Sequence, residues 1–159
     1  MTNEQYTAKN WLMRLNDYAA KVDAERRTLE MLQHRLYRGV AHYDGPGRHD
    51  PDAARAAHET ALLDFSEQAA RVEKAQKAYM AELEITREIL ETLPTYLRPL
   101  AIDRYINGQK WKELEKIYPY SIAELYRQNN EILEHVAEIL NAKPTKLIIT
   151  QNKAQQAAV

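Results

Sequence analysis

The chain has 159 residues, a formal net charge of −1 and no cysteine. The length suits one domain, or a long helical element joined to a small globular one, and the lack of cysteine excludes disulfides, thiolate zinc sites and a cysteine nucleophile, as is typical of a protein of the reducing cytoplasm. Because the molecule as a whole is nearly neutral, any contact with nucleic acid has to come from a local patch of charge.

The first predicted element is a long amphipathic helix that ends before residue 39. Its apolar residues fit a seven-residue repeat that Glu25 interrupts, and the members of this repeat are Ala8, Trp11, Leu15, Tyr18, Val22, Leu29, Leu32 and Leu36. Glycines and prolines are concentrated in residues 39–52, and this composition predicts a loop.

A second long helix follows the loop, with Asp50 as its cap and Pro51 as its first residue. The same repeat runs through it, with Gln76 and Thr86 as polar exceptions, in Leu62, Phe65, Ala69, Val72, Tyr79, Leu83, Leu90 and Leu93. The two helices are expected to fold back as an antiparallel hairpin over residues 1–93, because each then buries its apolar stripe on the other.

The hairpin has two interpretations. Apolar heptad stripes usually form a core, so the hairpin is interpreted first as a scaffold or a dimerisation stalk. The second helix also carries ten alanines between Ala53 and Ala81, and small side chains let another helix approach closely. A groove for a partner helix is therefore the alternative.

Shorter elements are predicted after Leu93 and Pro94, which end the second long helix. The third helix, residues 95–106, is expected to stop at an Asn107-Gly108 cap. The residues of this helix that are expected to face inward are Leu97, Leu100, Ala101 and Ile106.

A short helix with the sequence WKELEKIY and a longer fourth helix complete the region. The short helix is expected to bury Trp111 and Leu114. Ser121 is expected to cap the fourth helix and Glu124 to complete a capping box, so that the helix begins at Ile122. Its expected buried face consists of Leu125, Ile132, Val136, Ile139 and Leu140.

A short helix, a tight turn and a longer helix are typical of a helix-turn-helix, here within a domain of residues 94–142. The last residues, 143–159, carry three lysines and no acidic residue and are expected to form a flexible tail. The sequence thus predicts an all-α protein with a long helical hairpin and a small helix-turn-helix domain.

Residues 93–136, LPTYLRPLAIDRYINGQKWKELEKIYPYSIAELYRQNNEILEHV, resemble the fourth region of the major bacterial sigma factors. They resemble more closely the ArpU-like regulators of Gram-positive phages, in which L-P … R-Y-I-x-G-x-x-W-x-E-[IL] … Y-S … [VL]-Y-R recurs. The positions that carry this pattern are Leu93, Pro94, Arg104, Tyr105, Ile106, Gly108, Trp111, Glu113, Leu114, Tyr120, Ser121, Leu125, Tyr126 and Arg127. The hairpin and the AKNWL sequence near the start match the same family in layout.

This resemblance implies a cytoplasmic phage protein that regulates transcription, often as an activator of late genes. By analogy with the sigma region, residues 122–130 enter the major groove of promoter DNA while the preceding helix contacts the backbone. The residues expected to contact DNA are Lys110, Lys112, Ser121, Tyr126, Arg127, Asn129 and Asn130. Double-stranded DNA is the expected partner, and RNA polymerase and a second copy of the chain, joined through the hairpin, are further candidates.

Charge and layout leave two other functions open. Residues 121–140 carry one basic side chain, Arg127, against four glutamates, a net charge of −3. Phosphates repel such a helix, which favours a protein-interaction adaptor that kept the fold and lost its DNA affinity. A small terminase-like DNA-packaging factor also combines a helix-turn-helix with a helical oligomerisation element, although its usual order is the reverse.

No pattern indicates an enzyme, a metal or a cofactor. The five histidines show no i,i+4 pair and no carboxylate in zinc-binding register, and there is no phosphate-binding glycine loop. Neighbouring acids such as Glu82 and Glu84 are assigned to solvated sides of a helix. No apolar stretch indicates a signal peptide or a membrane span, so we expect a cytoplasmic protein that does not bind membranes.

Overall fold

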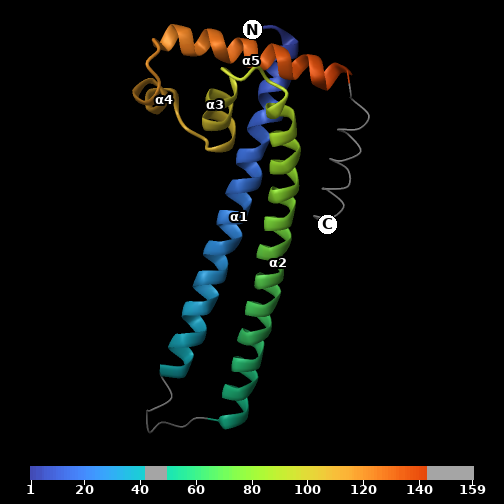
Figure 1. The fold of residues 1–159 in the computed structure, drawn as a ribbon. Helices are drawn as coiled ribbons and strands as arrows, with labels where there is room; N and C mark the ends of the chain where they lie inside the picture. Colours follow the sequence, from blue (N-terminus) through green and yellow to red (C-terminus); the bar gives the residue numbers. More distant parts are fainter. Residues whose placement is uncertain (42–49, 143–159) are drawn as a thin grey trace. The chain divides into compact units, whose positions relative to one another are not determined.

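The structure, a computed structural model, describes residues 1–41 and 50–142 (Figure 1). All regular elements in these two ranges are helices, so the predicted all-α class is confirmed. They are α1 (Asn3–Ala41), α2 (Pro51–Glu91), α3 (Arg98–Ala101), the π-helical turn η1 (Ile102–Ile106), α4 (Trp111–Ile117) and α5 (Ile122–Ala142). Among the described helices, none is both long enough and apolar enough to cross a membrane.

The two long helices begin and end close to the predicted residues. α1 continues to Ala41, three residues into the predicted loop. α2 begins at Pro51, where the Asp52 backbone N–H donates to Asp50 Oδ1 over 3.0 Å, so the predicted cap is confirmed. The remainder of the predicted loop, residues 42–49, and the predicted tail, residues 143–159, lie outside the described residues.

The described chain forms two compact units, and each long helix contributes to both. In the unit of residues 20–77, Gln68 Nε2 donates to the Glu25 carbonyl over 3.0 Å and to its carboxylate over 2.5 Å, so the polar break in the repeat has a partner on α2. Val22 and Ala75 are buried, but Leu62, expected in the buried stripe, is 47% exposed. Two paired helices cover only a narrow stripe of each other, which leaves the edges of a wider apolar face open.

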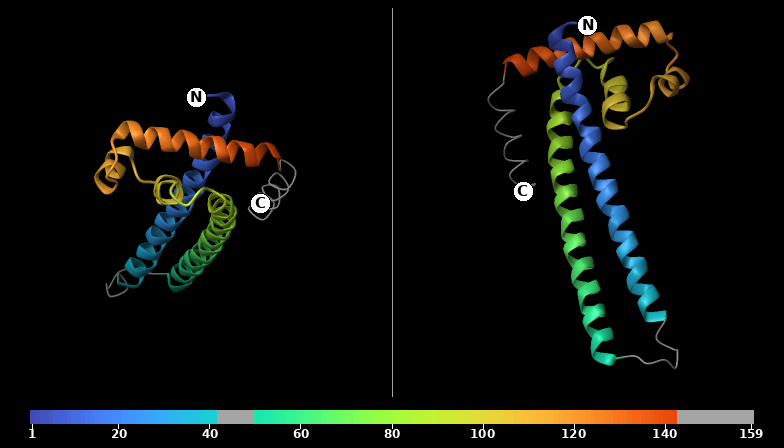
Figure 2. Two further views of the ribbon diagram at one scale, coloured as in Figure 1. Left: turned by 45° about the horizontal axis from the view of Figure 1, so that its top comes forward. Right: turned by 180° about the vertical axis from the view of Figure 1, so that it is seen from behind.

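Of the described residues, the second unit contains 1–19 and 78–142, and it holds the main core. Figures 1 and 2 show α5 crossing the start of α1 and the end of α2, and Gln5 Nε2 on α1 donates to Glu134 Oε1 on α5 over 2.8 Å. The core consists of Ala8, Leu12, Ile89, Leu90, Leu93, Leu97, Leu100, Ala101, Tyr105, Leu114, Leu125, Ile132, Leu133, Val136 and Ala137.

A buried ion pair in this unit corrects the assignment of Glu82 to a solvated face. The Glu82 side chain is fully buried, and its Oε2 lies 2.6 Å from Arg14 Nη2. The Arg14 guanidinium also lies 3.6 Å from the centre of the Trp11 ring. Burial lowers the pKa of Arg14, and the charge of Glu82 opposes this shift. Glu82 can be buried because Arg14 pairs with it, and the heptad pattern of the second long helix does not reveal this partner.

The predicted third helix is shorter and less regular than expected. It begins at Arg98 instead of residue 95 and passes at Ile102 into η1, where the Asn107 N–H donates to the Ile102 carbonyl over 2.9 Å with the wide spacing of a π-helix. The predicted cap is confirmed: Asn107 ends η1, and Gly108 has a left-handed φ of +69°. The residues expected to face inward are buried or half-buried, namely Leu97, Leu100, Ala101 and Ile106.

α4 and α5 begin at the predicted residues, and α4 ends at Ile117, one residue earlier than predicted. The Glu124 N–H donates to Ser121 Oγ over 3.3 Å, so the cap at Ser121 is confirmed. The reciprocal bond of a capping box is absent from the described hydrogen bonds, because the Glu124 carboxylate binds Arg127 and Gln128 instead. The expected inner face is buried at Leu125, Ile132 and Val136 and half-buried at Ile139 and Leu140.

Candidate functional site

Side chains of η1 fix both ends of α4. Asp103 Oδ2 accepts a 2.7 Å hydrogen bond from the hydroxyl of Tyr118, the residue that caps α4. Arg104 Nη1 donates to the Gln109 carbonyl over 2.8 Å, and its guanidinium carbon lies 5.0 Å from the centre of the Trp111 ring at the start of α4. Burial, and then the bond to Asp103 and the charge of Asp103, raise the pKa of the Tyr118 hydroxyl, which therefore stays protonated and able to donate.

The next residue of η1, Tyr105, reaches α5. Its hydroxyl donates to Asn129 Oδ1 over 2.7 Å, and the two residues are 2% and 7% exposed. Burial raises the pKa of this hydroxyl to about 12, against smaller lowering effects of the Arg104 charge and the Asn129 bond. Three consecutive side chains, Asp103 to Tyr105, thus fix the orientation of both α4 and α5.

This bond corrects one of the expected DNA contacts. Asn129 lies four residues after Leu125 and three before Ile132, so it shares the buried face of α5 with them. Its amide oxygen is already bonded inside the protein, and the side chain is not available to a base edge. The helical spacing alone would have placed Asn129 on the inner face.

An aromatic pair joins α4 directly to α5. The Trp111 and Tyr126 rings have centroids 4.7 Å apart and planes inclined by 44°. Trp111 is half-buried and packs against the core, and Leu114 is the fully buried residue of α4. Tyr126 keeps 46% of its surface exposed and remains available for a further contact.

Of the remaining expected contacts, three lie at the starts of the two helices, and Asn130 lies further along α5. Lys110 and Lys112 are exposed at the start of α4, where the Lys110 N–H donates to Glu113 Oε2 over 2.7 Å. Ser121 is exposed before the first turn of α5, and Asn130 is exposed two turns later. The starts of both helices therefore present polar groups from elements whose positions η1 fixes.

Arg127, in contrast, is already paired on the surface of α5. Its Nε and Nη2 lie 2.8 Å and 2.6 Å from the two carboxylate oxygens of Glu124, and its Nη1 bonds Glu131. The bond from Arg127, helped by Gln128, lowers the pKa of Glu124 to about 2, and Glu124 raises the pKa of Arg127. The cation expected to contact DNA is therefore neutralised within its own helix.

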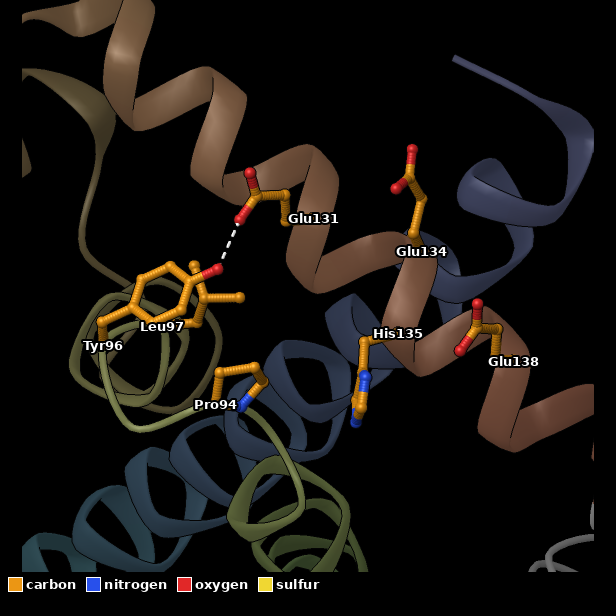
Figure 3. A pocket seen from close by; sticks show the side chains of 7 residues that line it. All are labelled: Pro94, Tyr96, Leu97, Glu131, Glu134, His135 and Glu138. Carbon is orange, nitrogen blue, oxygen red and sulfur yellow. Dashed lines mark hydrogen bonds between the residues drawn. The ribbon is translucent and has the colours of Figure 1, made fainter.

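Beyond Arg127, α5 borders an acidic hollow of about 300 Å³ (Figure 3). Figure 3 shows the Tyr96 hydroxyl directed at Glu131, to which it donates over 2.9 Å, and His135 extending toward the segment that contains Pro94. The hollow is lined by Pro94, Tyr96, Leu97, Glu131, Glu134, His135 and Glu138. Three carboxylates around one open hollow repel phosphates, so the first half of α5 is better suited to DNA than the second half.

The sequence analysis did not identify Asp103 and Tyr118 as the residues that hold α4 in place. The one available signal was a run of polar residues inside an otherwise amphipathic helix.

Among the described residues, no group of three or more histidines, aspartates or glutamates could hold a metal ion. Comparison of the chain with protein-family models, with curated proteins and with solved structures found no match.

Proposed function

We propose that the protein binds double-stranded DNA through a helix-turn-helix composed of α4, residues 118–121 and α5, and regulates transcription as the phage proteins that it resembles do. The observation that carries this proposal is the attachment of both helices to the three consecutive residues Asp103, Arg104 and Tyr105. A helix that reads bases has to present its side chains in a fixed orientation, and a site on rigid elements meets this requirement.

The charge distribution supports contact through the starts of the helices. Lys110 and Lys112 can bind phosphates, and the N-terminus of the 21-residue helix α5 favours anions. Tyr126 and Asn130 then lie on the exposed face of its first half. Contact limited to this half keeps the acidic hollow away from phosphates.

We further infer that α1 and α2 form an antiparallel hairpin that joins a second copy or contacts RNA polymerase. Arg14 pairs with Glu82, whereas Glu25, further along α1, pairs with Gln68, earlier on α2. This reversal of order supports antiparallel pairing. Within the unit of residues 20–77, the exposed apolar side chains that support association are Met31, Leu62 and Leu63.

The second candidate function is that of a protein-interaction adaptor. The observation that favours it is the pairing of Arg127 with Glu124 and Glu131, together with the acidic hollow beside it. An adaptor of this kind would bind a basic partner through the second half of α5 and would have no affinity for duplex DNA.

A binding assay on fluorescently labelled duplex DNA over a range of salt concentrations separates the two functions. If Lys112 binds a phosphate, Lys112→Gln weakens binding to all sequences and lowers the slope of log affinity against log salt by about one. The matched control is Lys21→Gln, which removes the same charge from an exposed position on α1 and should leave the slope unchanged. Absence of wild-type binding at low salt and micromolar protein would contradict DNA binding and support the adaptor.

A further inference from the structure

We propose that Glu124, Glu131 and Tyr96 form a latch on Arg127 that sets the DNA affinity of α5. This inference rests on the proposed DNA-binding function and names the residues that regulate it. We call these four residues the Arg127 latch.

All four residues of the latch are bonded to one another in the structure. Glu124 binds Arg127 through both carboxylate oxygens, at 2.6 Å and 2.8 Å, and Glu131 binds the third guanidinium nitrogen. Because the two glutamates lie three residues before and four residues after Arg127, the helix itself brings them together. Phosphates and guanine use the same bidentate geometry as a carboxylate, so DNA has to displace these glutamates to engage Arg127.

Tyr96 connects the latch to a second part of the fold. It precedes α3 and donates to Glu131 Oε2 over 2.9 Å, while Arg127 binds the other oxygen, Oε1. Glu131 is thus held between two donors, one on its own helix and one on another segment. The bond from Tyr96 keeps the Glu131 carboxylate beside Arg127. Glu134 and Glu138 line the same hollow, but among the described salt bridges neither pairs with Arg127.

The test compares two variants that remove the same charge from the same hollow. Glu131→Gln removes one of the two carboxylates that hold Arg127 and leaves Glu124 in place, whereas Glu138→Gln removes neither. Exposed ion pairs contribute modestly, so Glu131→Gln should raise the affinity for duplex DNA about twofold to fivefold more than Glu138→Gln does. Tyr96→Phe changes no charge and should raise affinity in the same direction by a smaller factor.

A double-mutant cycle separates the latch from simple repulsion. In an Arg127→Gln background, the extra gain of Glu131→Gln over Glu138→Gln should disappear, because there is no guanidinium to release. An equal gain from the two single variants, or an extra gain that persists without Arg127, would overturn the latch. Circular dichroism of every variant checks that the helices remain folded.

The same measurements distinguish failure of the latch from failure of the function. Wild-type binding with equal gains from the two glutamate variants would leave DNA binding intact and exclude the latch. Binding that appears only in Glu131→Gln, and that depends on Arg127, would support both. No binding by wild type or any variant, at low salt and micromolar protein, would overturn the DNA function and the latch together.

Discussion

Removal of the Tyr105 hydroxyl tests whether the contact from η1 to α5 stabilises the fold. Tyr105→Phe keeps the ring and deletes only the group that donates to Asn129 Oδ1 over 2.7 Å. Both residues are almost fully buried, so the amide oxygen loses its partner and gains no access to water. A buried polar group left unpaired costs about 1 to 3 kcal/mol, and this is the expected loss in free energy of unfolding.

Chemical denaturation followed by tryptophan fluorescence measures this loss. The chain has two tryptophans, Trp11 and Trp111, and both lie in the unit that contains Tyr105. The midpoint should fall while the dependence on denaturant stays constant. Tyr96→Phe is the matched control: it removes the same atom from a residue that is 63% exposed and should change stability by less than about 0.5 kcal/mol. If Tyr105→Phe also lowers the free energy of unfolding by less than about 0.5 kcal/mol, the bond from Tyr105 to Asn129 does not stabilise the fold.

Three further predictions concern the same unit. Gly108→Ala should cost about 1 to 2 kcal/mol, because φ at residue 108 is +69°; an unchanged midpoint would contradict this backbone geometry. Glu82→Ala should cost about 3 to 5 kcal/mol because it leaves Arg14 unpaired, and replacing both by leucine should recover most of the loss; no recovery would show that the charges themselves are required. Alkaline pH should destabilise the protein. Burial raises the pKa of Tyr105 from 10.0 to about 12, and the pKa of Tyr118 is also raised. Both phenols therefore stabilise the fold below pH 10, and this contribution is lost as the pH rises through the raised pKa values. Between pH 10 and about pH 12, the denaturation midpoint should fall less with rising pH in Tyr105→Phe than in wild type.

Repeats and caps made the helices predictable from the sequence. The heptad stripes gave two long helices, and Asp50, Ser121 and Gly108 marked helix ends because their side chains, or the lack of one, suit a cap or a left-handed turn. α4 and α5 therefore begin at the expected residues. The sequence offered no signal for the π-helical turn, or for Tyr118 and Asn129 as the partners that its side chains bind further along the chain.

The candidate site was harder to predict because exposure depends on tertiary partners. Lys110, Lys112 and Ser121 are exposed as the expected contacts require, whereas Asn129 is turned inward by its bond to Tyr105. Arg127 has the exposure expected of a DNA contact, but Glu124 and Glu131 already bind it. The spacing of these three residues was visible in the sequence, and the contribution of Tyr96 from another segment was not.

The most direct test of DNA binding through α4 and α5 is a titration of isotopically labelled protein with duplex DNA, followed by NMR. We predict that the amide signals of residues 110–112 and 121–127 shift first and most. The signals of residues 20–77 should not shift, unless two copies of the chain associate. Shifts restricted to the unit of residues 20–77, or no shift at low salt with DNA in excess, would contradict the account.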